Sequence, residues 1–148
     1  VVIDFGVLDG YSTVCLALAC KENNKGKVKV YDLFDDYEFN HAKLKTLVNN
    51  LKDYGLIDWV EIEEKNFFDW VKDPEQFDLL HLDISNTGDI LDIVWDNLQG
   101  KGTVLFEGGS EQRDNVGWMK IYNKKPINKS RAQFDVVNPL FPSLSKLK

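Results

Sequence analysis

Short apolar runs alternate with longer segments of helical periodicity through residue 107, and this alternation constrains the fold more than any other feature. The apolar runs lie at 1–5, 28–31, 59–62, 77–82 and 103–106. Each has the length of a buried strand, whereas Leu44, Leu47 and Leu51 recur at the spacing of a helix. Strands that alternate with helices are typical of a parallel sheet covered on both faces. We therefore expect one α/β domain over residues 1–148, built on a doubly wound, mostly parallel sheet.

The same reading gives the positions of the other elements. Helices are expected from Val14 to about residue 23 and over 44–51, 68–72, 90–98 and 114–122. The tail is less regular, with a sixth strand expected at 134–137. A seventh strand at 143–147 would pair antiparallel at the edge of the sheet.

Charge and cysteine content restrict the partners and the compartment. The net charge of -6 disfavours nucleic acid and anionic membrane surfaces as partners, because both carry negative charge. No apolar run approaches the roughly 18 residues that span a bilayer. Cys15 and Cys20, five positions apart in a helical segment, would face different sides of that helix. We interpret both as reduced core thiols, which favours a cytoplasmic location.

Polar residues follow the first two strands, where ligands bind in open α/β sheets. Gly6 and Gly10 allow a tight turn and a close backbone approach, and Ser12 can cap the helix that follows. Asp32 directly follows the second strand, where a carboxylate can accept ribose hydroxyls. The residues alone leave open a ligand-free turn at the glycines and a solvated acid at Asp32. The loop lacks the G-x-G-x-x-G pattern, which argues against an NAD-dependent oxidoreductase.

Four segments resemble class I S-adenosylmethionine-dependent methyltransferases of the small-molecule O-methyltransferase type. Residues 4–13 (DFGVLDGYST) are similar to motif I in its acid-x-G-x-x-x-G-[YF]-S-[TA] form. Tyr31-Asp32 resembles the acid after strand two, and residues 77–83 (FDLLHLD) resemble strand four. Residues 98–106 (LQGKGTVLF) are similar to the approach to strand five. The resemblance implies a Rossmann-like fold, methyltransferase activity and S-adenosylmethionine as the cofactor.

The resemblance also implies a role for each site residue. Gly6 and Gly10 would lie under the methionine part of the cofactor, and Asp4 would orient its ammonium group directly or through water. Asp32 would hold the ribose hydroxyls, while Asn66 and Phe67 would flank the adenine. The expected cofactor-binding residues are therefore Asp4, Gly6, Gly10, Ser12, Asp32, Asn66, Phe67 and Asp83. Asp83 would also lie near the methyl-transfer site, and we expect Asp83 and then Glu107 to be the catalytic acids.

The sequence departs from the family pattern in three places. Metal-dependent members carry an Asp-Asn pair after strand five, where this chain has Glu107-Gly108, so we expect no required metal. Asn86 stands where another branch carries a histidine base. The helices that usually precede strand one are absent from this sequence, and we expect the domain to lack these cap helices.

The sequence therefore predicts methyl transfer to a small molecule at oxygen. The alternative is a cofactor-binding or scaffold domain of the same fold without catalysis. Homo-oligomer formation is left open.

Overall fold

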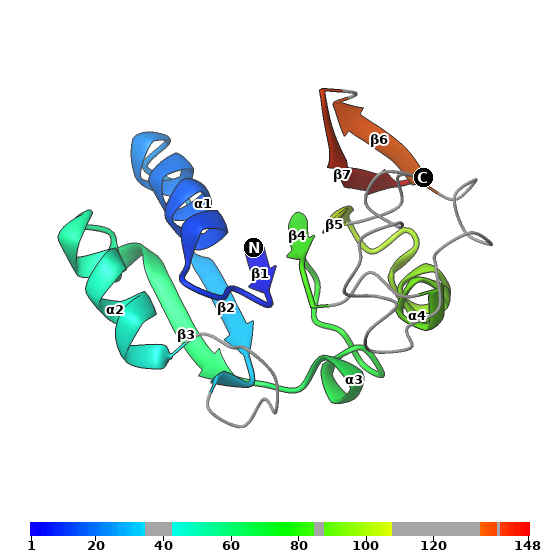
Figure 1. Cartoon of the computed structure of the whole chain (residues 1–148), viewed down its shortest axis with the longest axis horizontal. Coiled ribbons are helices and arrows are strands. Elements are labelled where there is room, and N and C mark those ends of the chain that lie inside the picture. Colours follow the sequence, from blue (N-terminus) through cyan, green and yellow to red (C-terminus); the bar gives the residue numbers. More distant parts are fainter. Residues whose placement is uncertain (35–42, 85–87, 108–133, 139) are drawn as a thin grey trace. The chain divides into compact units, whose positions relative to one another are not determined.

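The computed structural model describes residues 1–34, 43–84, 88–107, 134–138 and 140–148 (Figure 1). The chain forms two compact units, Val1–Trp70 and Val71–Lys148. Strands alternate with helices in both units, and the parallel strands outnumber the antiparallel ones. The predicted α/β class with a mostly parallel sheet is confirmed.

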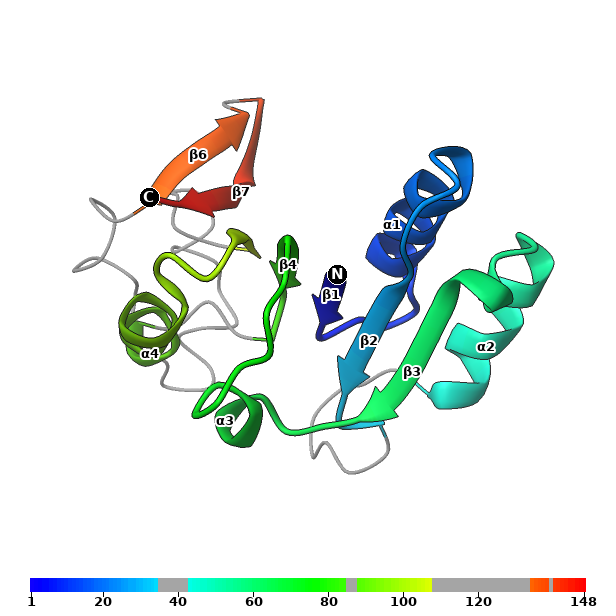
Figure 2. The same ribbon diagram turned by 180° about the vertical axis from the view of Figure 1, so that it is seen from behind.

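The first unit contains three parallel strands in the order β3-β2-β1 (Figure 2). They are β1 (Val2–Phe5), β2 (Val28–Asp32) and β3 (Val60–Glu64). Parallel register places Asp4 beside Val30 and Phe5 beside Tyr31. Because the strands run in one direction, the residues that follow their carboxyl ends lie along one edge of the sheet.

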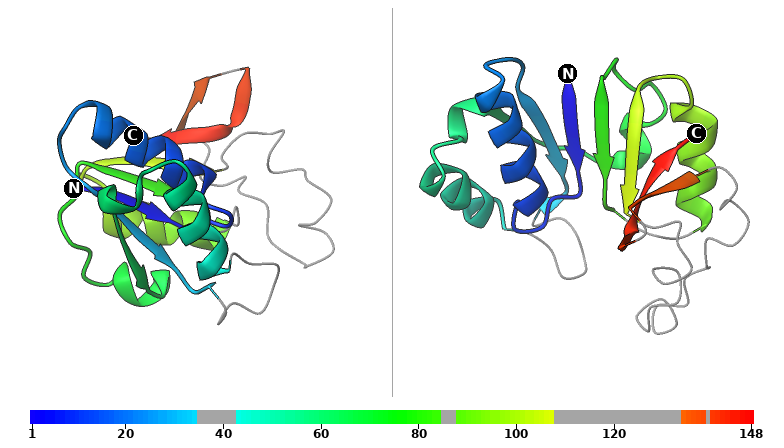
Figure 3. Two further views of the ribbon diagram at one scale, coloured as in Figure 1. Left: turned by 90° about the vertical axis from the view of Figure 1, so that its left-hand side faces the viewer. Right: turned by 90° about the horizontal axis from the view of Figure 1, so that it is seen from above.

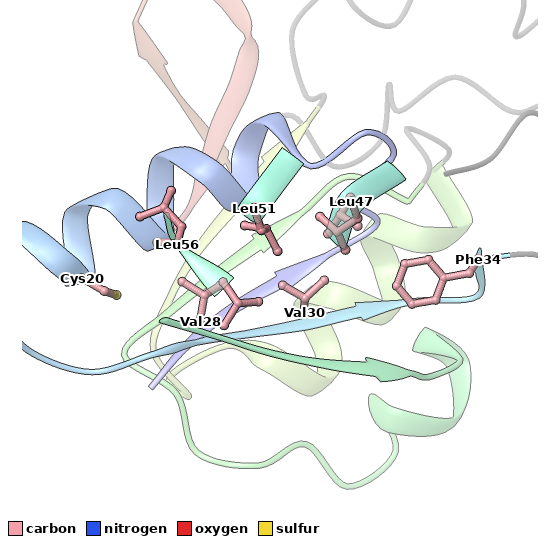
Figure 4. Packing of buried hydrophobic residues seen from close by; sticks show 10 residues of the cluster. Cys20, Val28, Val30, Phe34, Leu47, Leu51 and Leu56 are labelled. Atoms are coloured by element: carbon pink, nitrogen blue, oxygen red, sulfur yellow. The ribbon is translucent and has the colours of Figure 1, made fainter. Parts of the chain in front are cut away.

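Helices cover both faces of this three-stranded sheet. On one face, Val28 and Val30 pack with residues of α1 (Tyr11–Glu22) and α2 (Leu44–Asp53), as Figure 4 shows. Leu47 of α2 is fully buried there, which stabilises the unit by roughly 2 kcal/mol. On the other face, the ring of Phe5 lies 5.4 Å from that of Phe67 in the short helix α3 (Phe67–Trp70). The alternation of side chains along each strand explains why the two cores are separate.

The amino ends of β2 and β3 are reached through glycine turns. After α1, the chain turns at Gly26, whose φ is 77° and where an added Cβ would meet nothing within 4 Å. After α2, Gly55 follows the C-cap residue Tyr54 with a φ of 64°, the conformation in which glycine commonly ends a helix. These turns lie at the edge of the sheet opposite to the strand carboxyl ends.

The second unit contains four strands in the order β4-β5-β7-β6 (Figure 3). The parallel pair is β4 (Leu79–Leu82) and β5 (Thr103–Glu107), connected through α4 (Gly88–Leu98). β7 (Phe141–Leu147) is antiparallel to β5 and to β6 (Phe134–Asn138). The predicted antiparallel strand is confirmed, although it begins two residues earlier than expected and lies between β5 and β6.

Several predicted boundaries differ from the structure. α1 begins at Tyr11 rather than at the predicted Val14. The prediction missed the first turn because its residues are polar and show no apolar periodicity. Trp59 belongs to a 3-10 turn, η2 (Ile57–Trp59), instead of opening β3. The predicted helix at 114–122 lies outside the described residues.

The prediction that both cysteines are core thiols is wrong for Cys15, which is exposed, whereas Cys20 is buried. The two positions do face different sides of α1, and only one side meets the core. Both thiols are free. No helix in the described part of the chain has the length and apolar character needed to cross a membrane.

Candidate functional site

The loop between β1 and α1 has an unusual backbone that its glycines permit. The φ angle is 81° at Gly6 and 86° at Gly10, values that residues with a Cβ rarely adopt. Between them, Leu8 takes a φ of 46° although it is not glycine. The Gly6 N–H donates to the Tyr31 carbonyl at 3.0 Å, and the Gly10 N–H donates to the Val7 carbonyl at 2.7 Å. One backbone hydrogen bond therefore closes the loop on itself, and another connects it to β2.

Asp4 is a buried carboxylate that ties β1 to the first turn of α1. Its exposed fraction is 0%, and it lies on the sheet face that α1 covers. Its Oδ2 accepts hydrogen bonds from the Thr13 hydroxyl at 2.6 Å and the Ser12 hydroxyl at 2.9 Å. Hydrogen bonds to a charged acceptor compensate the cost of burying it. The expected site residues Asp4 and Ser12 are thus in direct contact.

Asp32 connects the same loop to the end of β2. Its Oδ2 accepts the Val7 N–H at 2.8 Å, and its Oδ1 accepts the Phe34 N–H at 2.8 Å. Asp32 is half-buried. A carboxylate has about four acceptor positions, so two hydrogen bonds leave room for additional donors on each oxygen. Asp32 therefore shapes the loop and retains capacity to bind a ligand.

The N-terminus of α1 faces this loop. Gly10 is the N-cap residue, and no side chain caps this helix end in the structure described. The expectation that Ser12 caps this helix is wrong, because Ser12 and Thr13 lie within the first turn of α1, where their hydroxyls donate to Asp4. The first backbone N–H groups of a helix have no acceptor within the helix and carry a partial positive charge. This end of α1 is suited to a carboxylate or another anion.

Asn66 and Phe67 follow β3, as expected, but their side chains have different surroundings. The Asn66 Oδ1 accepts the Phe68 N–H at 2.8 Å and so caps α3. Phe67 is only 3% exposed and packs against Phe5. The neighbouring Phe68 is 47% exposed. The prediction overlooked Phe68, and its position beside Phe67 gave no signal of which ring would be exposed.

Asp83 and Glu107 belong to the second unit, at the carboxyl ends of its parallel strands. Leu82 lies beside Phe106 in the register of β4 and β5, so the two acids that follow occupy the same level. Asp83 is exposed and Glu107 is half-buried, and both take part in interactions. Among the described residues, no group of three or more His, Cys, Asp and Glu side chains could hold a metal ion.

Parallel strands that lead into a glycine loop, an open helix N-terminus and strand-end carboxylates define an α/β domain of the nucleotide-cofactor-binding class. Residues 3–107 match the sequence family described as "Methyltransferase domain", and the chain belongs to this family. The identification as a class I methyltransferase domain is confirmed, and family membership implies S-adenosylmethionine as its cofactor. The NAD-dependent alternative is set aside.

Solved structures show the same fold. An S-adenosylmethionine-dependent O-methyltransferase from Thermotoga maritima is 25% identical with a TM-score of 0.56; the match covers 82% of this chain and 43% of that one. The O-methyltransferase TomG from Streptomyces achromogenes, solved with S-adenosylmethionine, is 18% identical with a TM-score of 0.52; the match covers 71% of this chain and 47% of that one. TrmK from M. capricolum, solved with S-adenosylhomocysteine, is 14% identical with a TM-score of 0.56; the match covers 99% of this chain and 61% of that one.

These three matches span between 43% and 61% of the solved chains, so this chain corresponds to about half of each. No curated protein shows a significant sequence match to the chain.

Proposed function

We propose that this domain binds S-adenosylmethionine at the loop after β1 and transfers its methyl group to a small molecule, at oxygen and without a required metal. The observation that carries the proposal is the pair of carboxylates, Asp4 and Asp32, that hold one glycine loop from two sides. When bound, the cofactor supplies a methyl group on a sulfonium that is already reactive. The protein must bind and align the reactants, and must remove a proton where the acceptor requires it.

The loop and α1 fit the amino-acid end of the cofactor. The open N–H groups of α1 would hold its carboxylate, because the helix end favours an anion. The Ser12 hydroxyl donates its proton to Asp4, so its oxygen is left as an acceptor. That oxygen would accept the ammonium group, and Asp4 would act through it because Asp4 is itself buried. Gly6 and Gly10 would lie beneath this part of the cofactor.

The nucleoside end would lie toward Asp32 and the start of α3. The remaining acceptor positions of Asp32 would bind the ribose hydroxyls while its bonds to Val7 and Phe34 persist. Asn66 and Phe67 would flank the adenine. We add Phe68 as the ring available for stacking, since Phe67 is buried among other aromatic rings.

Asp83 and Glu107 are the proposed catalytic acids, with Asp83 also proposed to contact the cofactor. A carboxylate at this position would accept a proton from an attacking hydroxyl or orient that hydroxyl. The net charge of -6 supports a small-molecule acceptor over nucleic acid or a membrane surface. The two free cysteines support a reducing, cytoplasmic location. Homo-oligomer formation is compatible with the proposal.

Calorimetry with S-adenosylmethionine, S-adenosylhomocysteine and NAD tests cofactor binding. Binding of both sulfur compounds and not of NAD is expected, and the absence of binding would overturn the proposal. Turnover of a panel of hydroxylated metabolites then separates an enzyme from the second candidate, a non-catalytic binding domain. That candidate is favoured by Asn86, which stands where related enzymes carry a histidine. Turnover that persists with excess chelator supports a metal-independent reaction, and recovery only after Mg²⁺ is restored contradicts it.

A further inference from the structure

We infer that Asn50, on α2, is a positioning residue that fixes the Gly6–Gly10 loop in its cofactor-binding shape; this inference rests on the proposed function. The Asn50 side-chain Nδ2 donates to the Asp9 backbone carbonyl at 2.7 Å. Asn50 is half-buried and lies 41 positions from Asp9 in the sequence. α2 contributes no residue to the proposed cofactor contacts, so this hydrogen bond reaches the loop from outside the site.

The hydrogen bond acts on a single peptide group. The Asp9 carbonyl and the Gly10 N–H belong to the same planar peptide unit. Its N–H donates to the Val7 carbonyl at 2.7 Å, and its C=O accepts from Asn50 at 2.7 Å. Hydrogen bonds at both ends restrain the rotation of this planar group about its flanking bonds. Because this unit directly precedes α1, its orientation also sets the direction of the first open N–H groups of the helix.

A second contact from α2 supports the same loop. An added Cβ at Gly10 would overlap the Leu47 side chain, so α2 packs directly against this glycine. Leu47 and Asn50 are three positions apart and share one face of α2. The helix thus contacts two successive loop residues, one through an apolar side chain and one through an amide.

The expected effect follows from the loop geometry. The Asp9–Gly10 peptide directly precedes the Cα of Gly10, whose φ is 86°, and Leu8, one residue before Asp9, has a φ of 46°. Without the Asn50 bond, this peptide gains rotational freedom that cofactor binding must remove. One neutral hydrogen bond corresponds to a loss of about three- to tenfold in cofactor affinity.

The test compares Asn50→Ala and Asn50→Asp with the matched controls Asn49→Ala and Asn49→Asp in the full chain. Asn49 is adjacent on α2 and exposed, so its substitutions keep the chemistry and the helix but spare the loop. Calorimetry with S-adenosylhomocysteine, well below the melting temperature, is expected to show about three- to tenfold weaker binding for Asn50→Ala. Asn50→Asp should bind more weakly still, because its carboxylate faces the Asp9 carbonyl without a proton to donate.

A pH series separates positioning from a general structural role. Relative to the unsubstituted chain at each pH, binding by Asn50→Asp should recover as the pH falls, because the protonated carboxyl can donate to the Asp9 carbonyl. The ratio for Asn50→Ala should stay constant. Faster amide exchange at Gly10 in the unliganded variants would report the same loosening.

The outcomes discriminate between the claims. Affinities equal to those of the Asn49 variants, with only a lower melting temperature, would overturn the positioning role. Failure of both Asn50 variants to fold beside folded Asn49 variants would assign Asn50 to stability instead. Absence of binding by the unsubstituted chain would overturn both this inference and the proposed function.

Discussion

Replacement of Asp32 by alanine tests how one carboxylate connects the structure of the loop to cofactor binding. The substitution leaves the N–H groups of Val7 and Phe34 without their carboxylate acceptor. It also removes the acceptor proposed for the ribose. Asp32→Ala is therefore expected to lower two separate quantities, the free energy of unfolding and the affinity for S-adenosylhomocysteine.

The magnitudes follow from the hydrogen bonds. Asp32 is half-buried, so water can replace part of each lost bond, and we expect about 1 kcal/mol per N–H, or about 2 kcal/mol of unfolding free energy. Binding should weaken by roughly 1.5–3 kcal/mol, the scale of hydrogen bonds to a charged group. Asp32→Asn keeps one carbonyl oxygen and should recover about half of the lost stability.

Urea unfolding followed by tryptophan fluorescence measures the first quantity, and calorimetry measures the second. Asp58→Ala is the matched control, because Asp58 is an exposed acid in the same unit. An unfolding free energy within about 0.5 kcal/mol of the unsubstituted chain would refute the role of Asp32 in the loop. Unchanged affinity in a folded Asp32→Ala variant would remove Asp32 from the cofactor site.

Three further substitutions or reactions test the local structure. Gly10→Ala should lower the free energy of unfolding by about 1–3 kcal/mol in urea titrations, because the φ of Gly10 is 86° and the Leu47 side chain occupies the space that a Cβ would need. An unchanged free energy of unfolding would contradict this backbone conformation. Thr13→Val should cost about 1–3 kcal/mol by the same measurement, since it removes a donor from the buried Asp4, and a neutral result would show that the bond is dispensable. A thiol reagent should modify the exposed Cys15 before the buried Cys20. Because burial raises the pKa of the Cys20 thiol, its reaction should also need a more alkaline pH. Equal reaction rates for the two thiols would refute the burial of Cys20.

Sequence patterns predicted the strands and the acids that follow them because both depend on local order. An apolar run flanked by glycine marks a buried strand, and an acid directly after it lies at the carboxyl end of that strand. This logic was sufficient to select Asp32, whereas Asp4 lies inside the first apolar run and was selected through the family resemblance. It also placed Asp83 and Glu107 at the ends of adjacent parallel strands, as the register of β4 and β5 shows.

The hydrogen-bond partners of these residues could not be predicted, because they depend on tertiary packing. Asp4 looked like a ligand-facing acid, but the sheet face on which it lies is covered by α1, where Thr13 and Ser12 reach it first. Asn50 carried no signal, since its partner lies 41 positions away. Helical periodicity gave neither the polar first turn of α1 nor its core face, whose buried residues are Thr13, Ala17 and Cys20, whereas Leu18 is exposed.

The glycine turns at the amino ends of β2 and β3 have a consequence for protein engineering. In the first unit, every residue proposed to meet the cofactor lies near or beyond the carboxyl end of a strand, whereas Gly26 and Gly55 lie at the opposite edge. At Gly26 an added Cβ would meet nothing within 4 Å, so the surrounding space is open to an inserted segment. A fluorophore or a fused domain attached beside Gly26 would therefore leave the cofactor loop unaltered. The same separation would let either turn be lengthened without a change to the residues proposed to meet the cofactor.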